Sequence, residues 1–279
     1  MFIKRTVSTM FLVPIFISAV IYSRGSLSFL VLILTNLLVA FGLLDFMYIT
    51  NRTGSKLLRT YGLITGLILH TILFFAYFFG YNPEQFIVPA TVIILLGMFL
   101  LQLIRQDIHL SIHGICTTIT GILYVVWLFS YMIRINYIRE PDGRWLIFML
   151  LLVTKSGDIF AYLIGSVFGR HKLIPKISPG KTIEGSIGGI LGSICVSILF
   201  SMVAPLPEQI VENAWLIGLF LGVFGQLGDL VESMLKRNGA VKDSGEYIPG
   251  MGGVLDLLDS VLFTAPIMYY YIQFGMRIS

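Results

Sequence analysis

Residues 27–49 read LSFLVLILTNLLVAFGLLDFMYI, and this stretch decides the fold class. A helix needs roughly 20 consecutive, mostly apolar residues to cross the hydrocarbon core of a bilayer, and this run is long enough. The same composition continues along the chain, because 56% of the 279 residues are hydrophobic, 12% are charged and the mean hydropathy is +0.88. One soluble core could not bury so much apolar surface. We therefore predict an all-α, polytopic integral membrane protein.

Apolar runs of transmembrane length recur along the whole sequence. We predict about nine transmembrane helices, near residues 7–22, 27–49, 57–80, 86–104, 112–133, 145–168, 184–204, 214–231 and 254–274. Cys116 and Cys195 fall inside these runs without metal-ligand spacing around them, so we interpret them as small packing residues.

Lysine and arginine are distributed unequally on the two sides of the predicted spans. Of the 19 basic residues, 13 fall on one side and 5 on the other, and Lys155 lies inside a span. The side richer in base is the cytoplasmic side. Its two longest loops, near residues 169–183 and 232–253, are also rich in charge, glycine and proline. We therefore expect an active site that faces the cytosol.

Ionisable side chains within or at the ends of spans gather in the second half of the sequence. A charged group inside a span costs roughly 2.5–3.5 kcal/mol on insertion scales, so such groups mark function by default. We predict that residues 1–140 form scaffold helices and that residues 141–279 form the catalytic helices with their cytoplasmic loops. The residues concerned are Lys155, Asp158, Glu184, Asp229, Glu232, Asp256 and Asp259.

The acidic residues are spaced so that they can meet. Asp229 and Glu232 are three residues apart, as are Asp256 and Asp259, and each pair therefore shares a helical face. Asp158 lies in a span that runs toward the same side. Carboxylates this close repel one another unless a cation lies among them, and oxygen ligands of this kind suit Mg²⁺. We predict a Mg²⁺ site here, with or without a second cation.

Basic residues follow the acidic helix end and also occupy the other long cytoplasmic loop. A metal beside basic side chains is what phosphoryl or nucleotidyl transfer requires, because both neutralise charge on the transferring phosphate. The alternative is that these bases act only as topology signals. The residues are Lys181, Lys236, Arg237 and Lys242.

The segment GAVKDSGEYIPGMGGVLDLLDS, residues 239–260, interrupts the apolar pattern before the last span. Gly250, Gly252 and Gly253 allow positive φ and a close approach of the backbone to a ligand, and Pro249 stiffens the entry. The N–H groups at the start of the next helix favour an anion. We interpret the segment as a phosphate cradle beside metal-binding aspartates.

Two ordered blocks of residues resemble the phosphatidate cytidylyltransferases, the CDP-diacylglycerol synthases. The first block reads Asp158-x-x-Ala161-Tyr162, Gly169-Arg170, Lys172-Leu173 and Ser178-Pro179-x-Lys181-Thr182-x-Glu184-Gly185. The second reads Ser233-x-x-Lys236-Arg237, Lys242-Asp243-x-Gly245 and Pro249-Gly250-x-Gly252-Gly253-x-x-Asp256-x-x-Asp259-Ser260. The resemblance is strong over about residues 154–262.

The resemblance implies a polytopic enzyme of the inner membrane that joins CTP and phosphatidic acid to give CDP-diacylglycerol and pyrophosphate, with no nucleic-acid partner and with a homodimeric assembly. It implies Asp229 and Asp256 as ligands of Mg²⁺, with Asp158 and Asp259 in or beside that site. It also implies roles in binding substrate. Phosphates would be held by Lys181, Lys236, Arg237 and Lys242, and the nucleotide by Ser178, Thr182, Glu184, Gly252 and Gly253.

Two positions depart from the family pattern. Met251 stands where the family usually has histidine, and Leu257 stands where it has arginine. Methionine binds phosphate weakly and leucine lacks a cation, so these changes bear on the phosphate site.

Two alternative functions and two structural interpretations complete the predictions. One rival is a related CTP-dependent enzyme that acts on a polyprenyl alcohol or an ether lipid, and the other is a cation transporter, whose intramembrane acids would line an ion path. We interpret His70, alone in a span, as a packed or hydrogen-bonded neutral histidine rather than a site residue. Glycines four residues apart, such as Gly188 with Gly192 and Gly218 with Gly222, predict close helix packing.

Overall fold

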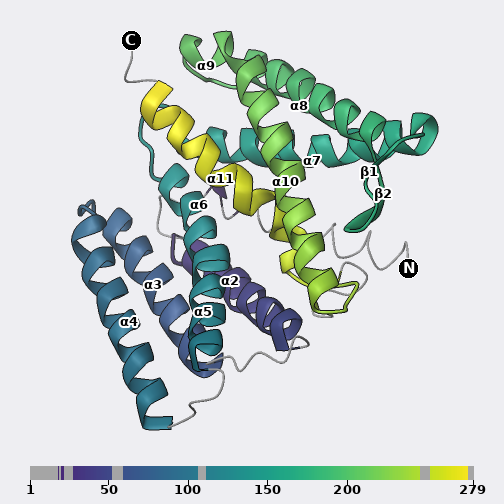
Figure 1. The fold of residues 1–279 in the computed structure, drawn as a ribbon. Helices are drawn as coiled ribbons and strands as arrows, with labels where there is room; N and C mark the ends of the chain where they lie inside the picture. The colour runs from purple at the N-terminus through teal and green to yellow at the C-terminus, as the bar shows by residue number, and fades with distance from the viewer. Residues whose placement is uncertain are drawn as a thin grey trace. The chain divides into compact units, whose positions relative to one another are not determined.

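The computed structural model describes residues 18, 20–21, 28–51, 59–105, 111–245 and 252–275, and nearly all of them lie in helices (Figure 1). The helices are α2 (Ser28–Asn51), α3 (Arg59–Phe78), α4 (Glu84–Arg105), α5 (Ser111–Gly121), the π-helix η1 (Ile122–Trp127), α6 (Leu128–Asn136), α7 (Gly143–Phe168), α8 (Ile183–Val203), α9 (Glu208–Glu212), α10 (Ala214–Asn238) and α11 (Leu255–Gly275). Two short strands, β1 (Lys172–Ile174) and β2 (Ser178–Thr182), complete the described elements.

Within these residues, seven helical segments are long and apolar enough to cross a membrane. The prediction of a polytopic all-α membrane protein is confirmed. The predicted span at 7–22 falls almost entirely outside the described residues. The predicted span at 254–274 is present as α11, although α11 is not one of the seven. Its first turn carries Asp256, and Asp259 follows three residues later.

Two local features differ from the sequence prediction. Helix α10 continues to Asn238, seven residues beyond the predicted end, so Lys236 and Arg237 lie in its last turn. Basic side chains are favoured there because they interact with the exposed carbonyl groups at the C-terminal end of a helix. The loop predicted at 169–183 contains an antiparallel hairpin, in which Lys172 lies opposite Thr182 and Ile174 opposite Ser178.

The chain divides into two compact units. The first comprises residues 1–133 and 235–257, and the second comprises residues 134–234 and 258–279. Both α10 and α11 therefore have residues in each unit. The predicted division into a scaffold (1–140) and a catalytic part (141–279) concerns function and stays a prediction.

In the first unit, α2, α3 and the π-helix η1 pack closely. A Cβ added to Gly66 of α3 would lie 2.8 Å from Leu43 Cδ1 and 3.1 Å from Val126 Cγ2, so a larger residue there would have to displace these side chains. His70 is fully buried and stacks on Phe129 with ring centroids 5.9 Å apart. The interpretation of His70 as a packing residue is confirmed.

In the second unit, α7 and α8 run side by side and the hairpin lies near one end of the pair (Figure 1). Gly188 and Gly192 of α8 lie directly against Ile164 and Phe160 of α7. A Cβ on Gly218 of α10 would lie 2.6 Å from the Cα atom of Ile194. Helix backbones in lipid approach this closely only where one partner has no side chain. The predicted packing role of these glycines is confirmed.

Candidate active site

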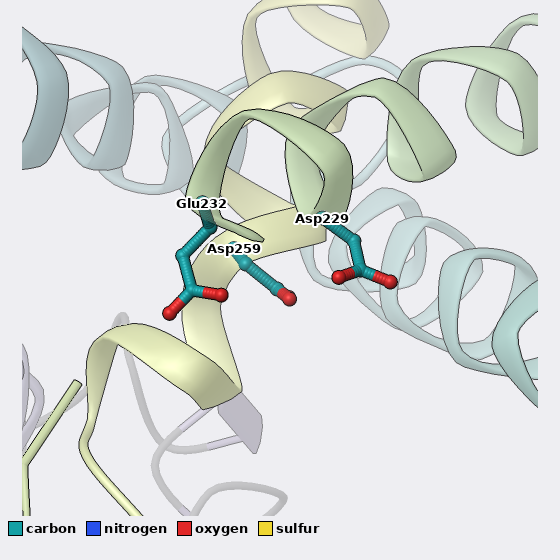
Figure 2. Close-up of side chains that lie close together, drawn as sticks. All are labelled: Asp229, Glu232 and Asp259. Atoms are coloured by element: carbon teal, nitrogen blue, oxygen red, sulfur yellow. The ribbon is translucent and has the colours of Figure 1, made fainter. Parts of the chain in front are cut away.

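Three carboxylates of the second unit converge where α10 passes α11. Asp229 and Glu232 project from α10 and Asp259 projects from α11, and their oxygens all lie within 4.8 Å of one another (Figure 2). Glu232 is fully buried and Asp259 is nearly so. The three-residue spacing of Asp229 and Glu232 produces this shared face, as predicted.

Lys155 supplies a positive charge to this acidic group. Its Nζ atom lies 3.4 Å from Asp158 Oδ2 and 3.9 Å from Asp259 Oδ1. Asp158 and Lys155 are three residues apart on α7, so both side chains lie on the same side of that helix. The ammonium group therefore offsets part of the repulsion among the carboxylates, a role that the sequence analysis did not assign.

A second ammonium group approaches from the hairpin. Lys181 of β2 lies with its Nζ atom 2.6 Å from Asp229 Oδ2. The sequence analysis predicted that Lys181 binds phosphate and that Asp229 binds a metal. The structure brings these two residues together, and in this state they neutralise each other.

Lys181 and Asp229 border a pocket of ≈ 420 Å³ between α7, the hairpin, α8 and α10. This volume lies in the range that is usual for small-molecule sites. The predicted residues Asp158, Ser178 and Thr182 line it. No site role was predicted for Tyr162, Ser186 and Gln226, which line it as well. The Gln226 amide is fixed from both ends, because its Oε1 accepts a hydrogen bond from Ser186 Oγ and its Nε2 donates to Ser186 O over 2.9 Å.

Polar contacts hold the hairpin at the N-terminus of α8. Thr182 caps α8, and its hydroxyl oxygen accepts a hydrogen bond from Gly185 N over 3.1 Å. Glu184 accepts hydrogen bonds from the backbone N–H groups of Arg170 and His171, and it lies 2.6 Å from His171 Nδ1. Glu184 does not line the pocket; it contacts the segment that leads into β1. Its predicted contact with the nucleotide stays a prediction.

Asp256 is surrounded by donors within the first unit. Its Oδ1 atom lies 2.6 Å from Lys236 Nζ. Its Oδ2 atom accepts hydrogen bonds from Ser244 N at 3.0 Å, Ser244 Oγ at 2.7 Å and Gly253 N at 2.8 Å. The backbone N–H of Gly253, predicted to face a phosphate, here binds this carboxylate. Gly252 has φ +93°, the left-handed conformation that was expected of a glycine in this segment.

The remaining predicted residues lie in more open positions. Arg237 and Lys242 are exposed, one in the last turn of α10 and the other just beyond it. Leu257 is half-buried in α11. Met251 and residues 246–250 lie outside the described residues. The catalytic, substrate-binding and metal-binding roles given to the predicted residues stay predictions.

Comparison with known proteins identifies the family of this chain. The sequence model of the Cytidylyltransferase family matches residues 3–275, which is nearly the whole chain. The chain belongs to the cytidylyltransferase family.

Curated relatives of this chain come from several bacteria. The chain is 47% identical to "Phosphatidate cytidylyltransferase" of Bacillus subtilis (strain 168), over 53% of this chain and 54% of the relative. It is 40% identical to "Uncharacterized protein YnbB" of Escherichia coli (strain K12), over 62% and 58%. It is 35% identical to "Phosphatidate cytidylyltransferase" of Synechocystis sp., over 61% and 66%. The matched segments span about half to two thirds of these relatives.

The acidic group of Asp229, Glu232 and Asp259 fits a small divalent cation. Two oxygens bound to one Mg²⁺ ion lie at most about 4.2 Å apart, because each Mg–O bond is about 2.1 Å long. Oxygens already within 4.8 Å need to move only slightly to reach that spacing. The residues that could hold the ion are Asp229, Glu232 and Asp259. Of these, Glu232 was recognised from the sequence as an intramembrane acid but was not assigned to the metal.

Proposed function

We propose that this cytidylyltransferase transfers CMP from CTP to phosphatidic acid, forming CDP-diacylglycerol and pyrophosphate in phospholipid biosynthesis. One observation carries the proposal: the pocket beside α8 has a lysine, Lys181, and two carboxylates, Asp158 and Asp229, in its wall. This combination suits a phosphate ester bound with a cation. Family membership and the printed names of the bacterial relatives support the same reaction.

In the proposed reaction, an oxygen of the lipid phosphate attacks the α-phosphorus of CTP. The bond between that phosphorus and the oxygen that bridges to the β-phosphate breaks, and pyrophosphate leaves with the bonding electrons. Lys181 binds the phosphate chain of the nucleotide and offsets its negative charge. The fixed amide of Gln226 and the capped end of α8 give the pocket a preorganised wall.

A divalent cation belongs to the proposal. When bound, Mg²⁺ would supply positive charge that offsets the negative charge developing on the leaving pyrophosphate. Asp229, Glu232 and Asp259 provide its protein ligands, and Asp158 orients the cluster through Lys155. Asp256 is also proposed as a ligand of a divalent cation.

We further propose a multi-pass protein of the bacterial inner membrane with its pocket open to the cytosol. The bacterial relatives and the 13-to-5 distribution of basic residues support this orientation. The membrane-embedded helices would admit the acyl chains sideways from the bilayer. The homodimer implied by the family resemblance belongs to the proposal as well.

The test uses purified protein in detergent with phosphatidic acid and CTP labelled at the α-phosphorus. We expect the label to enter a chloroform-soluble product that co-migrates with CDP-diacylglycerol, and we expect chelation of Mg²⁺ to abolish its formation. CTP labelled at the γ-phosphorus should instead release all its label as pyrophosphate. Incorporation with a polyprenyl alcohol or an ether lipid, but not with phosphatidic acid, would replace the proposed acceptor. A cation flux through the protein reconstituted in sealed vesicles, without any labelled lipid, would replace the enzyme with a transporter.

A further inference from the structure

A buried carboxylate in the first unit contacts the segment that carries Asp256. Asp45 lies near the end of α2 and has 0% of its surface exposed. Its Oδ2 atom accepts a hydrogen bond from Leu255 N over 2.9 Å and lies 3.4 Å from Ser244 Oγ. These partners are 210 and 199 residues away in sequence. A buried charge is costly unless it is hydrogen-bonded, so this contact needs a reason.

The contact falls at a place where a helix needs an acceptor. Leu255 is the first residue of α11, and the first N–H groups of a helix have no partner inside that helix. A carboxylate at this end also interacts favourably with the helix dipole. Asp45 therefore performs, from a distant helix, the task that a capping side chain performs locally.

The same contact reaches Asp256 through two routes. Asp256 follows Leu255 directly, so the position of the Leu255 amide sets where the Asp256 side chain begins. Ser244, which lies beside Asp45, donates from both its N–H and its hydroxyl to Asp256 Oδ2. The Ser244 hydroxyl lies within hydrogen-bond distance of both carboxylates, 2.7 Å from Asp256 Oδ2 and 3.4 Å from Asp45 Oδ2, and so links the two.

Glycine makes this arrangement possible. A Cβ atom added to Gly253 would collide with Asp45 Oδ2 and with Ser244 Oγ. Position 253 must therefore lack a side chain for the loop backbone to reach the carboxylate of α2. Gly253, predicted to help bind phosphate, is therefore also required for the contact between this loop and Asp45.

We propose that Asp45 is a positioning residue for the cytidylyl transfer reaction: through Leu255 and Ser244 it fixes the orientation of Asp256 and its partner Lys236. This inference rests on the proposed function for its activity readout. It also gives the first half of the sequence, predicted to be scaffold, a part in forming the site.

The experiment compares Asp45→Asn, which keeps the shape but removes the charge, with Thr35→Val as a matched control. Thr35 is also buried on α2, and among the described residues its hydroxyl bonds only to backbone carbonyls of the same helix. For Asp45→Asn we expect kcat to fall about ten-fold while KM for CTP changes about two-fold or less. Thr35→Val should keep the wild-type kcat. Equal kcat values in the two variants, both normalised to folded protein, would overturn the proposal.

A double-mutant cycle with Ser244→Ala tests whether the two residues act through one group. We expect the double variant to lose little more than the worse single variant, because both changes release Asp256. Effects on kcat that multiply independently would contradict the inference. If Asp45→Asn fails to fold, Ser244→Ala carries the test, because it removes only a hydroxyl and should lower kcat with little effect on KM.

Hydrogen exchange separates this inference from the proposed function. In Asp45→Asn, the peptide covering residues 252–258 should exchange faster than in wild type, while peptides from α3 remain unchanged. Unchanged exchange at 252–258, or acceleration throughout the chain, would refute the positioning role. If wild-type protein transfers no label to lipid, the proposed function fails, and the exchange result still decides the role of Asp45.

Discussion

The Nζ atom of Lys155 lies 3.4 Å from Asp158 Oδ2, one helical turn along α7. The same ammonium group lies 3.9 Å from Asp259, so it contacts both Asp158 and one member of the acidic group. A cation bound by the acidic group would compete with it for Asp259. A side chain of the protein, Lys155, thus offsets part of the negative charge of these carboxylates.

Replacing Lys155 with methionine, which has a similar length and no charge, should expose this competition. We expect Lys155→Met to unfold at a lower temperature than wild type without divalent cations and to gain more stability from added Mg²⁺. The apparent Mg²⁺ affinity should rise about ten-fold, which corresponds to about 1.4 kcal/mol. Thermal unfolding against Mg²⁺ concentration measures this. Lys172→Met, at an exposed residue of β1, is the control, and identical Mg²⁺ curves for the two variants would contradict the prediction.

Lys181 should matter for nucleotide binding far more than its neighbour on the hairpin. We expect Lys181→Gln to raise KM for CTP about ten-fold or more, because a hydrogen bond to a charged group contributes about 1.5–3 kcal/mol. Lys172→Gln should leave KM within about two-fold, because a lone surface charge contributes at most about 1 kcal/mol. Steady-state kinetics at saturating lipid measure both. Equal effects would show that the hairpin acts through its overall charge.

Removing one negative charge from the acidic group should nearly abolish turnover. Asp229→Asn and Asp259→Asn keep the size of the side chain, and we expect each to lower kcat by at least about 100-fold while the protein still purifies as a folded species. Glu208→Gln, at an exposed acid on α9, controls for the loss of one charge. Activity near the wild-type value in either aspartate variant would remove that residue from the metal site.

The orientation in the membrane can be tested with single cysteines after Cys116 and Cys195 are changed to serine. Cysteine at the exposed position Asp243 should react with a membrane-impermeant reagent only from the cytosol, and cysteine at the exposed position Arg139 only from the opposite side. Labelling in intact cells and in inverted vesicles distinguishes the two faces. The reverse pattern would overturn the proposed access of CTP.

The two departures from the family pattern make a further prediction. Restoring both residues, as Met251→His with Leu257→Arg, should raise kcat about ten-fold if the arginine makes a charge-assisted contact only in the transition state. Leu257 is half-buried, so an arginine there can extend its charged end toward solvent. Cytidylyl transfer per mole of folded protein and thermal stability are measured together. Lower activity together with lower stability would show that the site has repacked around the leucine.

The sequence predicted what depends on hydropathy and helical spacing. Apolar length located α2 to α4, α7, α8 and α10, and the three-residue spacing of Asp229 and Glu232 predicted their shared face. The hairpin was missed because β1 and β2 are only three and five residues long and carry lysine, proline and glycine rather than an alternating pattern. Asp45 was missed for another reason. A single acid in an apolar helix shows no sign of a partner 210 residues away, and only tertiary structure reveals the contact.

The ion pair between Lys181 and Asp229 couples the two ligands that the pocket is proposed to bind. A divalent cation that takes Asp229 releases the lysine for a phosphate, and a phosphate that takes Lys181 releases the aspartate for a cation. By thermodynamic linkage, the nucleotide must raise the cation affinity by the same factor as the cation raises the nucleotide affinity. Either ligand alone must break the 2.6 Å ion pair while giving a new partner to only one of its two side chains. If nucleotide and metal bind as proposed, this one pair of side chains would make each ligand favour the binding of the other.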